Sequence, residues 1–248
     1  MNTRPPQSGF TLIELLASIG IIAVLSALLV PTVAKIRSSA DSTKCSSNLR
    51  QLGIAINLYA TENDDRLPGP IGSGVGRALV NNQTGQLIYH LQPYLELSAP
   101  TSTATYPRIL QCPALRGTLM GTQSNWYDVT TYVGYSNNDL PTAKQYLSDR
   151  TVVDGNSQSW PVGPWGRSNS TPGTPGWKRS WLADSINPGK TLPSGEKPTL
   201  AAIPAIREID ATLKSWPWPV PTKPVHGSHH NVLLFDWHVE RMPVTAYK

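Results

Sequence analysis

The feature that most restricts how this chain can fold is an apolar run near its N-terminus. From Phe10 to Val30 the sequence has 21 residues with a single formal charge, at Glu14. An α-helix rises about 1.5 Å per residue, so this run is long enough to cross the roughly 30 Å hydrocarbon core of a bilayer. The sequence therefore predicts a helix that spans a membrane once.

A removable secretory signal is the first alternative for this run. Such a signal has an apolar region of about 7 to 15 residues behind a positively charged start. The apolar run here is longer, and the segment before it carries only one cation, Arg4. The one plausible signal-peptidase cleavage site downstream, after Ala34, matches the small-x-small cleavage signature only weakly. We therefore expect the helix to be retained.

Glu14 needs a partner if it lies inside the membrane. A carboxylate in that position costs about 2.5 to 3.5 kcal/mol on insertion scales. Cleavage after Gly9 would make Phe10 the first residue, and its α-amino group on a neighbouring copy would then pair with Glu14. One such charge pair would set the axial register between subunits.

The segment from Gly9 to Leu16 resembles the N-terminal signal of type IV pilins and type II secretion pseudopilins. In that family a dedicated peptidase cuts after the residue that matches Gly9, and the residue that matches Phe10 is N-methylated. The family glutamate falls on Glu14, and Pro31 stands where many members place a helix-kinking proline. The resemblance implies subunit assembly through Phe10 and Glu14. An ordinary signal anchor with a chance acidic residue is the alternative.

The resemblance also implies a location and a set of partners. The expected location is the inner membrane, with one membrane pass and a periplasmic head, and after assembly a pseudopilus or cell-surface filament. The expected partners are other copies of the chain, related pilin-like subunits, the prepilin peptidase and an inner-membrane assembly platform. The sequence is equally consistent with three kinds of filament: a secretion pseudopilus, an adhesive pilus and a DNA-uptake fibre.

A helical pattern continues after Pro31 to about Asn63. Its apolar or near-apolar positions alternate spacings of four and three residues, which places them on one face: Cys45, Leu49, Leu52, Ile56 and Tyr59. Charged and amide side chains lie away from that face: Lys44, Arg50, Gln51 and Asn57. The second half of the helix is therefore predicted to pack against a head domain.

These patterns predict an α+β, pilin-like fold. A long N-terminal helix, transmembrane in its first half and amphipathic in its second, would pack on a small antiparallel β-sheet head with long irregular loops. The expected divisions are a leader at 1–9, an assembly helix at 10–30, an amphipathic helix at 31–63 and a head at 64–248.

A second resemblance concerns one large pilin-like subgroup. The segment from Lys44 to Gly53, with Tyr59 and Pro68 downstream and the pair Cys112-Pro113 further on, is similar to the helix and Cys-Pro pair of that subgroup. Its C-terminal H-x9-DG motif is matched by His226 and Asp236, except that Trp237 replaces the glycine. A tight turn often needs positive φ at that position, which tryptophan adopts poorly, so another turn is expected there.

The chain has two cysteines, Cys45 and Cys112. A head exported across the inner membrane meets an oxidising compartment, where the pair could form one disulfide. Two buried thiols are an equal alternative, because free cysteine packs as a small hydrophobe. A metal site would need more ligands than this pair offers.

The head is predicted from short apolar segments between turn-rich stretches. The strand candidates are 108–111, 131–135 and 231–235, and the last is expected to belong to a C-terminal hairpin at about 230–242. The stretch 160–224 is rich in Pro, Gly and Ser and is expected to be an irregular insertion. It contains six tryptophans: Trp160, Trp165, Trp177, Trp181, Trp216 and Trp218. Packing of these rings is favoured over an exposed surface for glycans or other subunits.

Five side chains near the C-terminus have metal-ligating chemistry: His226, His229, His230, Asp236 and His238. Their spacing does not favour a site, because adjacent residues of a strand point to opposite faces and no helical metalloprotease motif accompanies them. A structural role for His226, in a hydrogen bond to the turn or to Asp236, is favoured. Asp64 and Asp65, or Asp236, could in principle hold calcium. The sequence lacks the ordered series of Asp residues that calcium-binding loops use, so no cofactor is expected.

Charge and motifs exclude other functions. The formal charge of +5 falls to +4 without the leader, and the basic residues are scattered, so nucleic-acid binding is not expected. The sequence has no phosphate-binding glycine loop and no nucleophile elbow. A structural, non-enzymatic subunit is the leading interpretation. The rivals are a membrane-anchored periplasmic metal hydrolase that uses the five C-terminal ligands and a tryptophan-rich surface adhesin.

Overall fold

The computed structural model describes part of the chain, and the fold is built from that part. The described residues are 11–71, 85–99, 101–103, 107–110, 112–115, 132–134, 147, 150–153, 159–166, 175–192, 195–208 and 225–244. For 132–134, 150–153 and 159–162 the description covers the backbone. Two compact units divide the chain, one ending at Ala40 and the other beginning at Asp41.

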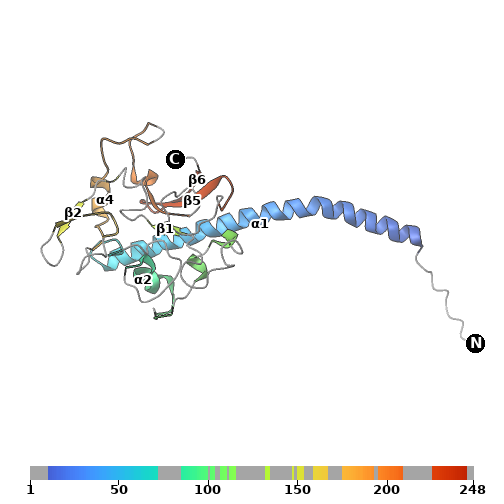
Figure 1. Ribbon diagram of the computed structural model, residues 1–248, viewed down its shortest axis with the longest axis horizontal. Coiled ribbons are helices and arrows are strands. Elements are labelled where there is room, and N and C mark those ends of the chain that lie inside the picture. Colours follow the sequence, from blue (N-terminus) through green and yellow to red (C-terminus); the bar gives the residue numbers. More distant parts are fainter. Residues whose placement is uncertain are drawn as a thin grey trace, which may run out of the picture. The chain divides into compact units, whose positions relative to one another are not determined.

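The first unit contains the N-terminal part of helix α1, which runs from Leu12 to Glu62 (Figure 1). Large apolar side chains from Leu12 to Ile36 are exposed along it, and several exceed 60 % exposure. Among the described residues α1 is the one helix long and apolar enough to cross a membrane. Apolar side chains all round this part of the helix are what a lipid or a bundle of similar helices would cover.

The second unit contains the C-terminal part of α1, which is amphipathic. Cys45, Leu49, Leu52 and Ile56 are almost completely buried, and Tyr59 is partly buried against the same core. Lys44, Arg50 and Gln51 are exposed. The face predicted from the alternating spacing is therefore the face that packs on the head.

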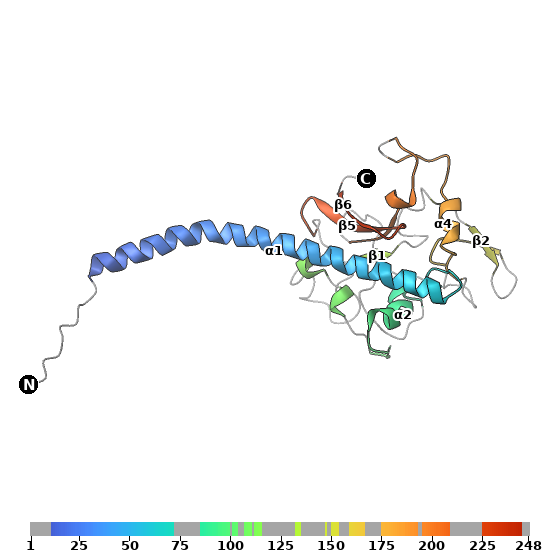
Figure 2. The same ribbon diagram turned by 180° about the vertical axis from the view of Figure 1, so that it is seen from behind.

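Helix α1 lies between two sets of elements within the second unit. Strands β5 and β6 lie on one side of it and helix α2 lies on the other in both views (Figures 1 and 2). The short helical elements are α2 (Leu87–Leu91), η1 (Gln92–Leu95), η2 (Arg108–Leu110), η3 (Pro113–Leu115), α4 (Ser180–Asp184) and η4 (Leu200–Ala202). Leu87, Ile88 and Leu91 of α2 are buried and extend the core that α1 forms.

The main sheet has four antiparallel strands in the order β1-β4-β5-β6. Their bounds are β1 Tyr132–Gly134, β4 Pro204–Glu208, β5 His229–Leu234 and β6 Val239–Pro243. Strand β5 lies in the middle and is buried from its second residue onward. A separate two-stranded sheet pairs β2 (Arg150–Val153) with β3 (Ser159–Val162). The α+β class and the small antiparallel head are confirmed.

Two predictions about the head are wrong. The expected strand at 108–111 is the 3-10 turn η2, in which the Leu110 amide bonds the Pro107 carbonyl at 3.0 Å. The stretch 160–224 is not wholly an irregular insertion, because it supplies the interior strand β4. Both charged residues of that strand, Arg207 and Glu208, are buried. Because they are charged, the strand lacks the apolar pattern from which a buried strand is predicted.

The tryptophans of this stretch contribute to packing where they are described. Trp165 and Trp177 are 2 % and 0 % exposed, and Trp181 packs against the same core. The rings of Trp165 and Phe235 lie 5.9 Å apart. The packing interpretation is confirmed for these three. Trp216, Trp218 and the side chain of Trp160 lie outside the described residues.

The turn between β5 and β6 uses a residue that the sequence argued against. The Trp237 amide donates to the Leu234 carbonyl at 2.9 Å, and the Leu234 amide donates to the His238 carbonyl at 3.0 Å. Trp237 has φ 70°, in the left-handed region. This is a three-residue hairpin loop whose last residue is left-handed, the position that glycine usually fills. The expectation of a turn other than the tight two-residue turn is therefore confirmed, but the argument that tryptophan avoids positive φ at this position is wrong.

Packing of the indole explains why tryptophan is tolerated at that position. The ring is half-buried, contacts the core and meets the Phe235 ring edge-on at 6.2 Å. A left-handed conformation costs an ordinary L-residue roughly 1 to 2 kcal/mol. The contacts of the indole offset this cost, because aromatic pairs contribute about 0.5 to 1.5 kcal/mol beyond their buried area.

Two substitutions at position 237 separate strain from packing. Both Trp237→Ala and Trp237→Gly lose the indole, but only Ala keeps the strained backbone. We therefore expect the Gly variant to be more stable than the Ala variant by about 1 kcal/mol, the reverse of the usual order. Denaturant unfolding of the full-length variants in detergent, followed by near-UV circular dichroism, measures the difference. An Ala variant as stable as the Gly variant would contradict the strain.

Candidate functional site

The start of α1 forms one candidate site, at Thr11 and Glu14. The Thr11 carbonyl accepts the first helical bond, from the Leu15 amide at 3.2 Å, so Thr11 is the N-cap of the helix. The Glu14 carboxylate accepts from the Thr11 amide at 2.9 Å and from its hydroxyl at 2.7 Å. The Glu14 amide in turn donates to the Thr11 hydroxyl oxygen at 3.4 Å. This reciprocal pattern is a capping box.

The capping role of Glu14 was not predicted, although the sequence carries its signal. Thr followed three residues later by Glu, at the start of an apolar run, is the signature of a capping box. Within one copy the carboxylate therefore has a local partner at the helix start. Gly9 and Phe10, the predicted cleavage and methylation positions, lie outside the described residues.

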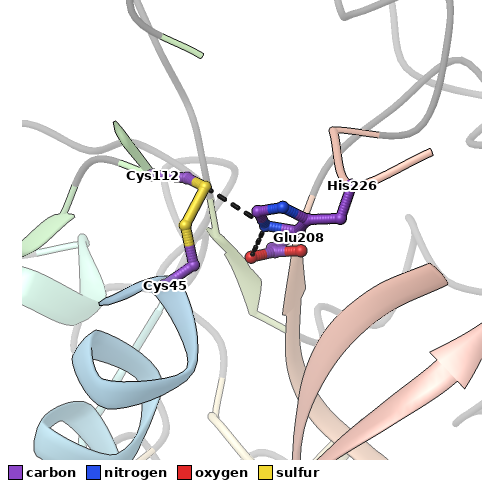
Figure 3. A group of neighbouring side chains, drawn as sticks. All are labelled: Cys45, Cys112, Glu208 and His226. Atoms are coloured by element: carbon purple, nitrogen blue, oxygen red, sulfur yellow. Dashed lines mark hydrogen bonds and ion pairs between the residues drawn. A yellow bond between two sulfur atoms is a disulfide. The ribbon is translucent and has the colours of Figure 1, made fainter. Parts of the chain in front are cut away.

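A second candidate site is a buried group in the head, which we call the Cys–His–Glu cluster: Cys45, Cys112, Glu208 and His226 (Figure 3). A disulfide joins Cys45 on α1 to Cys112, with their Cα atoms 5.1 Å apart. The Nε2 atom of His226 lies 3.4 Å from the Cys112 sulfur and 3.1 Å from Glu208 Oε1. All four residues are at least 90 % buried.

Hydrogen bonds hold the Glu208 carboxylate within the cluster. Its Oε2 accepts from the Asn231 amide at 2.9 Å, and its Oε1 accepts from Asn231 Nδ2 at 2.9 Å. Asn231 Nδ2 also lies 3.4 Å from the Ser42 carbonyl of α1. A buried carboxylate is costly unless it is paired or well hydrogen-bonded. Here three groups contact it: the Asn231 amide, Asn231 Nδ2 and His226 Nε2.

The structure divides the five predicted C-terminal ligands and does not gather them at one site. His226 joins the buried cluster, and its ring stacks on that of His229 at 5.5 Å. His238 pairs with Asp236 at 2.7 Å in the exposed hairpin loop. His230 is buried on β5. No group built from these five is found among the described residues that could hold a metal ion.

The predicted hydrogen bond between His226 and the turn or Asp236 is wrong. His226 precedes strand β5 and Asp236 follows it. A strand of six residues spans roughly 20 Å, so the two residues lie near opposite ends of it. The partner of His226 is Glu208, which is adjacent in space through the pairing of β4 with β5.

His229 links the cluster to α1. Its Nε2 atom lies 3.2 Å from the Ser42 hydroxyl. Burial lowers the pKa of the His229 imidazole, and the neighbouring His226 lowers it further. The neutral form of His229 is therefore favoured in the folded head, where it lies against the helix.

A third group, at Asp65 and Arg179, ties the end of α1 to α4. Arg179 forms an ion pair with Asp65 and donates to Asn57 Oδ1 at 2.9 Å, and the Ser180 amide donates to Asp65 Oδ2 at 3.2 Å. Burial raises the pKa of the Asp65 carboxyl, but hydrogen bonds and the Arg179 charge outweigh it, so this pKa lies below its ordinary value. Asp65 was a weak calcium candidate from sequence, and in the structure its partner is Arg179.

The low pKa of Asp65 predicts an acid-sensitive contact. The contact is complete above the ordinary carboxyl pKa of about 3.9 and is lost as the pH falls through the lower pKa of the folded state. We expect Arg179→Gln to lower the melting temperature at about pH 6, and the gap to wild type to narrow below about pH 3.5. Thermal scans across this range, with Lys190→Gln at an exposed lysine as a matched control, measure the gap. A gap independent of pH would contradict the assignment.

Comparisons with known proteins support the interpretation of the N-terminal region. Residues 4–30 match the family described as the prokaryotic N-terminal methylation motif. Type II secretion system core protein G of Pseudomonas aeruginosa is 35 % identical over 60 residues, which are 24 % of this chain and 42 % of that protein. The protein of the same name from Escherichia coli is 36 % identical over 63 residues, 25 % of this chain and 43 % of that protein. No solved structure matches the chain.

The class of protein follows from the helix, the head and this N-terminal match. A prepilin-type methylation motif, a long helix with an exposed apolar half and a small antiparallel head make the chain pilin-like. The two relatives given above are both described as type II secretion system core protein G, and each matches about a quarter of this chain. The chain spans less than half the length of the curated relatives that it matches.

Proposed function

We propose that this protein is a structural subunit of a type II secretion pseudopilus or a related filament. In this proposal the prepilin peptidase cuts after Gly9 and methylates Phe10. The processed subunit is then held in the inner membrane with its head in the periplasm. An assembly platform then adds it to the growing filament. The work of the protein is mechanical and not catalytic.

The observation that carries the proposal is the exposed apolar half of α1, which is joined through one continuous helix to a folded head. In the part of the chain that the structure describes, sixteen large apolar side chains are exposed, and fourteen of them lie between Leu12 and Ile36. In a soluble monomer so large an apolar surface is unfavourable. A bilayer covers it before assembly, and the same segments of neighbouring copies cover it in a filament.

The geometry of such an assembly determines its growth. One copy's Phe10 amine would meet another copy's Glu14, so two different surfaces would be joined at each contact. A contact of this kind is heterologous, and when its rotation does not close into a ring it produces an open helical filament. The head, which begins near Asp41, would cover the outside of the shaft.

Filament formation in cells tests the proposal. The full-length chain is expressed with a prepilin peptidase and an assembly platform in a host that lacks its own pilins. We expect filaments in the sheared fraction that bind antibody against the head. A Gly9→Val variant should remain uncut and in the membrane fraction, because the β-branched side chain blocks the cut after position 9. Processed protein that never leaves the membrane fraction would contradict the proposal.

A further inference from the structure

The Cys–His–Glu cluster contains four side chains whose chemistry suits a metal ion. One sulfur from each of Cys45 and Cys112, the Nε2 atom of His226 and one Glu208 oxygen all lie within 4.8 Å of one another. Thiolate, imidazole and carboxylate are the protein ligands of Zn²⁺, and a closed set of four is typical of structural zinc sites. Sequence reasoning set aside a metal at the cysteines because two ligands are too few. The fold places two further ligands, Glu208 and His226, beside the two cysteines.

We propose that the chain with reduced cysteines binds one Zn²⁺ at this cluster, and that the Cys45–Cys112 disulfide is the metal-free alternative of the same site. The disulfide and the zinc site exclude each other, because each uses both sulfurs. The head therefore has two ways to join α1 to the segment between η2 and η3 that holds Cys112, and the redox state of the two cysteines selects between them.

Two distances in the cluster lie within or close to the range for tetrahedral coordination. With ligand bonds of about 2.0 to 2.3 Å, neighbouring ligand atoms of a tetrahedral zinc site lie roughly 3.3 to 3.7 Å apart. The Cys112 sulfur lies 3.4 Å from His226 Nε2, which lies 3.1 Å from Glu208 Oε1. In the reduced chain the two sulfurs must separate. In this proposal, rotation about the Cα–Cβ bonds of the two cysteines, whose Cα atoms are 5.1 Å apart, supplies the movement.

The surroundings already orient one of the ligands. Asn231 donates its backbone amide to one Glu208 oxygen and its side-chain amide to the other, and it belongs to the buried interior strand β5. Hydrogen bonds of this kind to a ligating carboxylate are typical of metal sites and raise metal affinity. The cluster is also closed to solvent, since Cys45, Cys112, Glu208 and His226 are 0 %, 1 %, 1 % and 8 % exposed.

Charge balance favours the metal in the reduced chain. Zinc binding releases two protons, since two thiols and Zn²⁺ give a zinc dithiolate and two H⁺, and the two thiolate charges balance the charge of the metal. Burial of the metal therefore adds no net charge to the apolar interior.

Conversion to the disulfide is a two-electron oxidation. The two thiolates form one S–S bond and release Zn²⁺, and their two electrons pass to a disulfide of a thiol–disulfide exchange partner. That partner takes up two protons and becomes a dithiol. Export from a reducing to an oxidising compartment would drive the conversion in this direction.

Metal binding by the full-length chain in detergent micelles tests the proposal. The protein is reduced with a phosphine, which leaves two thiols and a phosphine oxide, and is then titrated with Zn²⁺ against a chromogenic chelator and separately with Co²⁺. We expect one zinc per reduced chain, thiolate-to-cobalt charge-transfer bands and tetrahedral cobalt d–d bands. The oxidised chain should bind none. A reduced chain that gives neither stoichiometric zinc nor these bands would overturn the proposal.

Substitutions separate this site from adventitious binding. Glu208→Gln keeps the shape of the side chain, removes its charge and should weaken zinc binding about 100-fold, since even outer hydrogen-bond partners of ligands contribute about 10- to 100-fold. The matched control is Glu240→Gln, which changes an exposed carboxylate on β6 and should bind as wild type. Equal affinities of the two variants would overturn the proposal.

Folding of the reduced chain supplies a second measurement that does not depend on variants. Near-UV circular dichroism of the reduced wild type with and without zinc reports the head packing. We expect zinc to raise its melting temperature and to slow alkylation of both cysteines by iodoacetamide. A reduced head that is unfolded and stays unfolded when zinc is added would also overturn the proposal. Filament assembly can succeed or fail independently of all these results.

Discussion

The Glu14→Ala variant is expected to enter the membrane as well as wild type and to fail in assembly. Removal of a carboxylate makes insertion easier, by about 2.5 to 3.5 kcal/mol on insertion scales. In the proposed filament it leaves the Phe10 amine of a neighbour buried and unpaired, which costs about 3 to 5 kcal/mol. We therefore expect at least a 100-fold loss of filament subunits. Immunoblots of membrane and sheared fractions measure the two effects separately.

Thr11→Val is the matched control for Glu14, because the structure gives that carboxylate a local role as well. The variant loses the hydroxyl that takes part in the capping box, at a cost of about 0.5 to 2 kcal/mol, but it keeps the carboxylate and the backbone amide of residue 11. We expect near-normal assembly. If Thr11→Val lost filaments as Glu14→Ala does, helix capping and not a pair between subunits would explain the glutamate.

The largest expected effect on stability follows loss of the Cys45–Cys112 disulfide. The bond joins residues 67 apart in sequence. In the chain-entropy account a closed loop of this length stabilises the folded state by about 4 kcal/mol at 25 °C. We expect Cys45→Ala to lower the denaturant midpoint of the head accordingly. The measurement is denaturant unfolding of the full-length variant in detergent, followed by near-UV circular dichroism.

The partner cysteine provides the control for this prediction. Either single substitution removes the whole bond, so Cys45→Ala, Cys112→Ala and the double variant should be destabilised by nearly the same amount. Reduction of the wild type in the presence of a metal chelator should produce a similar change. Effects of the two substitutions that simply add would show that packing of the two side chains, and not their covalent bond, stabilises the head.

The parts of the fold that could be predicted from sequence are those specified by local patterns. The length of α1 and its buried face followed from an uninterrupted apolar run and from the spacing of Leu49, Leu52 and Ile56. Periodicity is a local signal that does not depend on the rest of the chain. The β5–β6 hairpin followed in the same way from an apolar run beside a turn.

The parts that could not be predicted depend on contacts between distant segments. Strand β4 carries Arg207 and Glu208 in buried positions, and only the fold supplies the partners that make this tolerable. Glu208 has no recognisable motif, yet it is the partner of His226 and of Asn231. His226 had been connected with Asp236 by a sequence spacing, whereas strand pairing connects it with Glu208.

The central claim is that the chain is a processed, pilin-like subunit, and the most direct test is the mass and N-terminal sequence of the membrane-bound protein from its native host. We predict a chain that begins at N-methylated Phe10, shorter by residues 1–9. A chain that begins at Met1, or one cut near Lys35, would contradict the claim. The first result would mean an ordinary membrane anchor, and the second would mean a secreted head without its assembly helix.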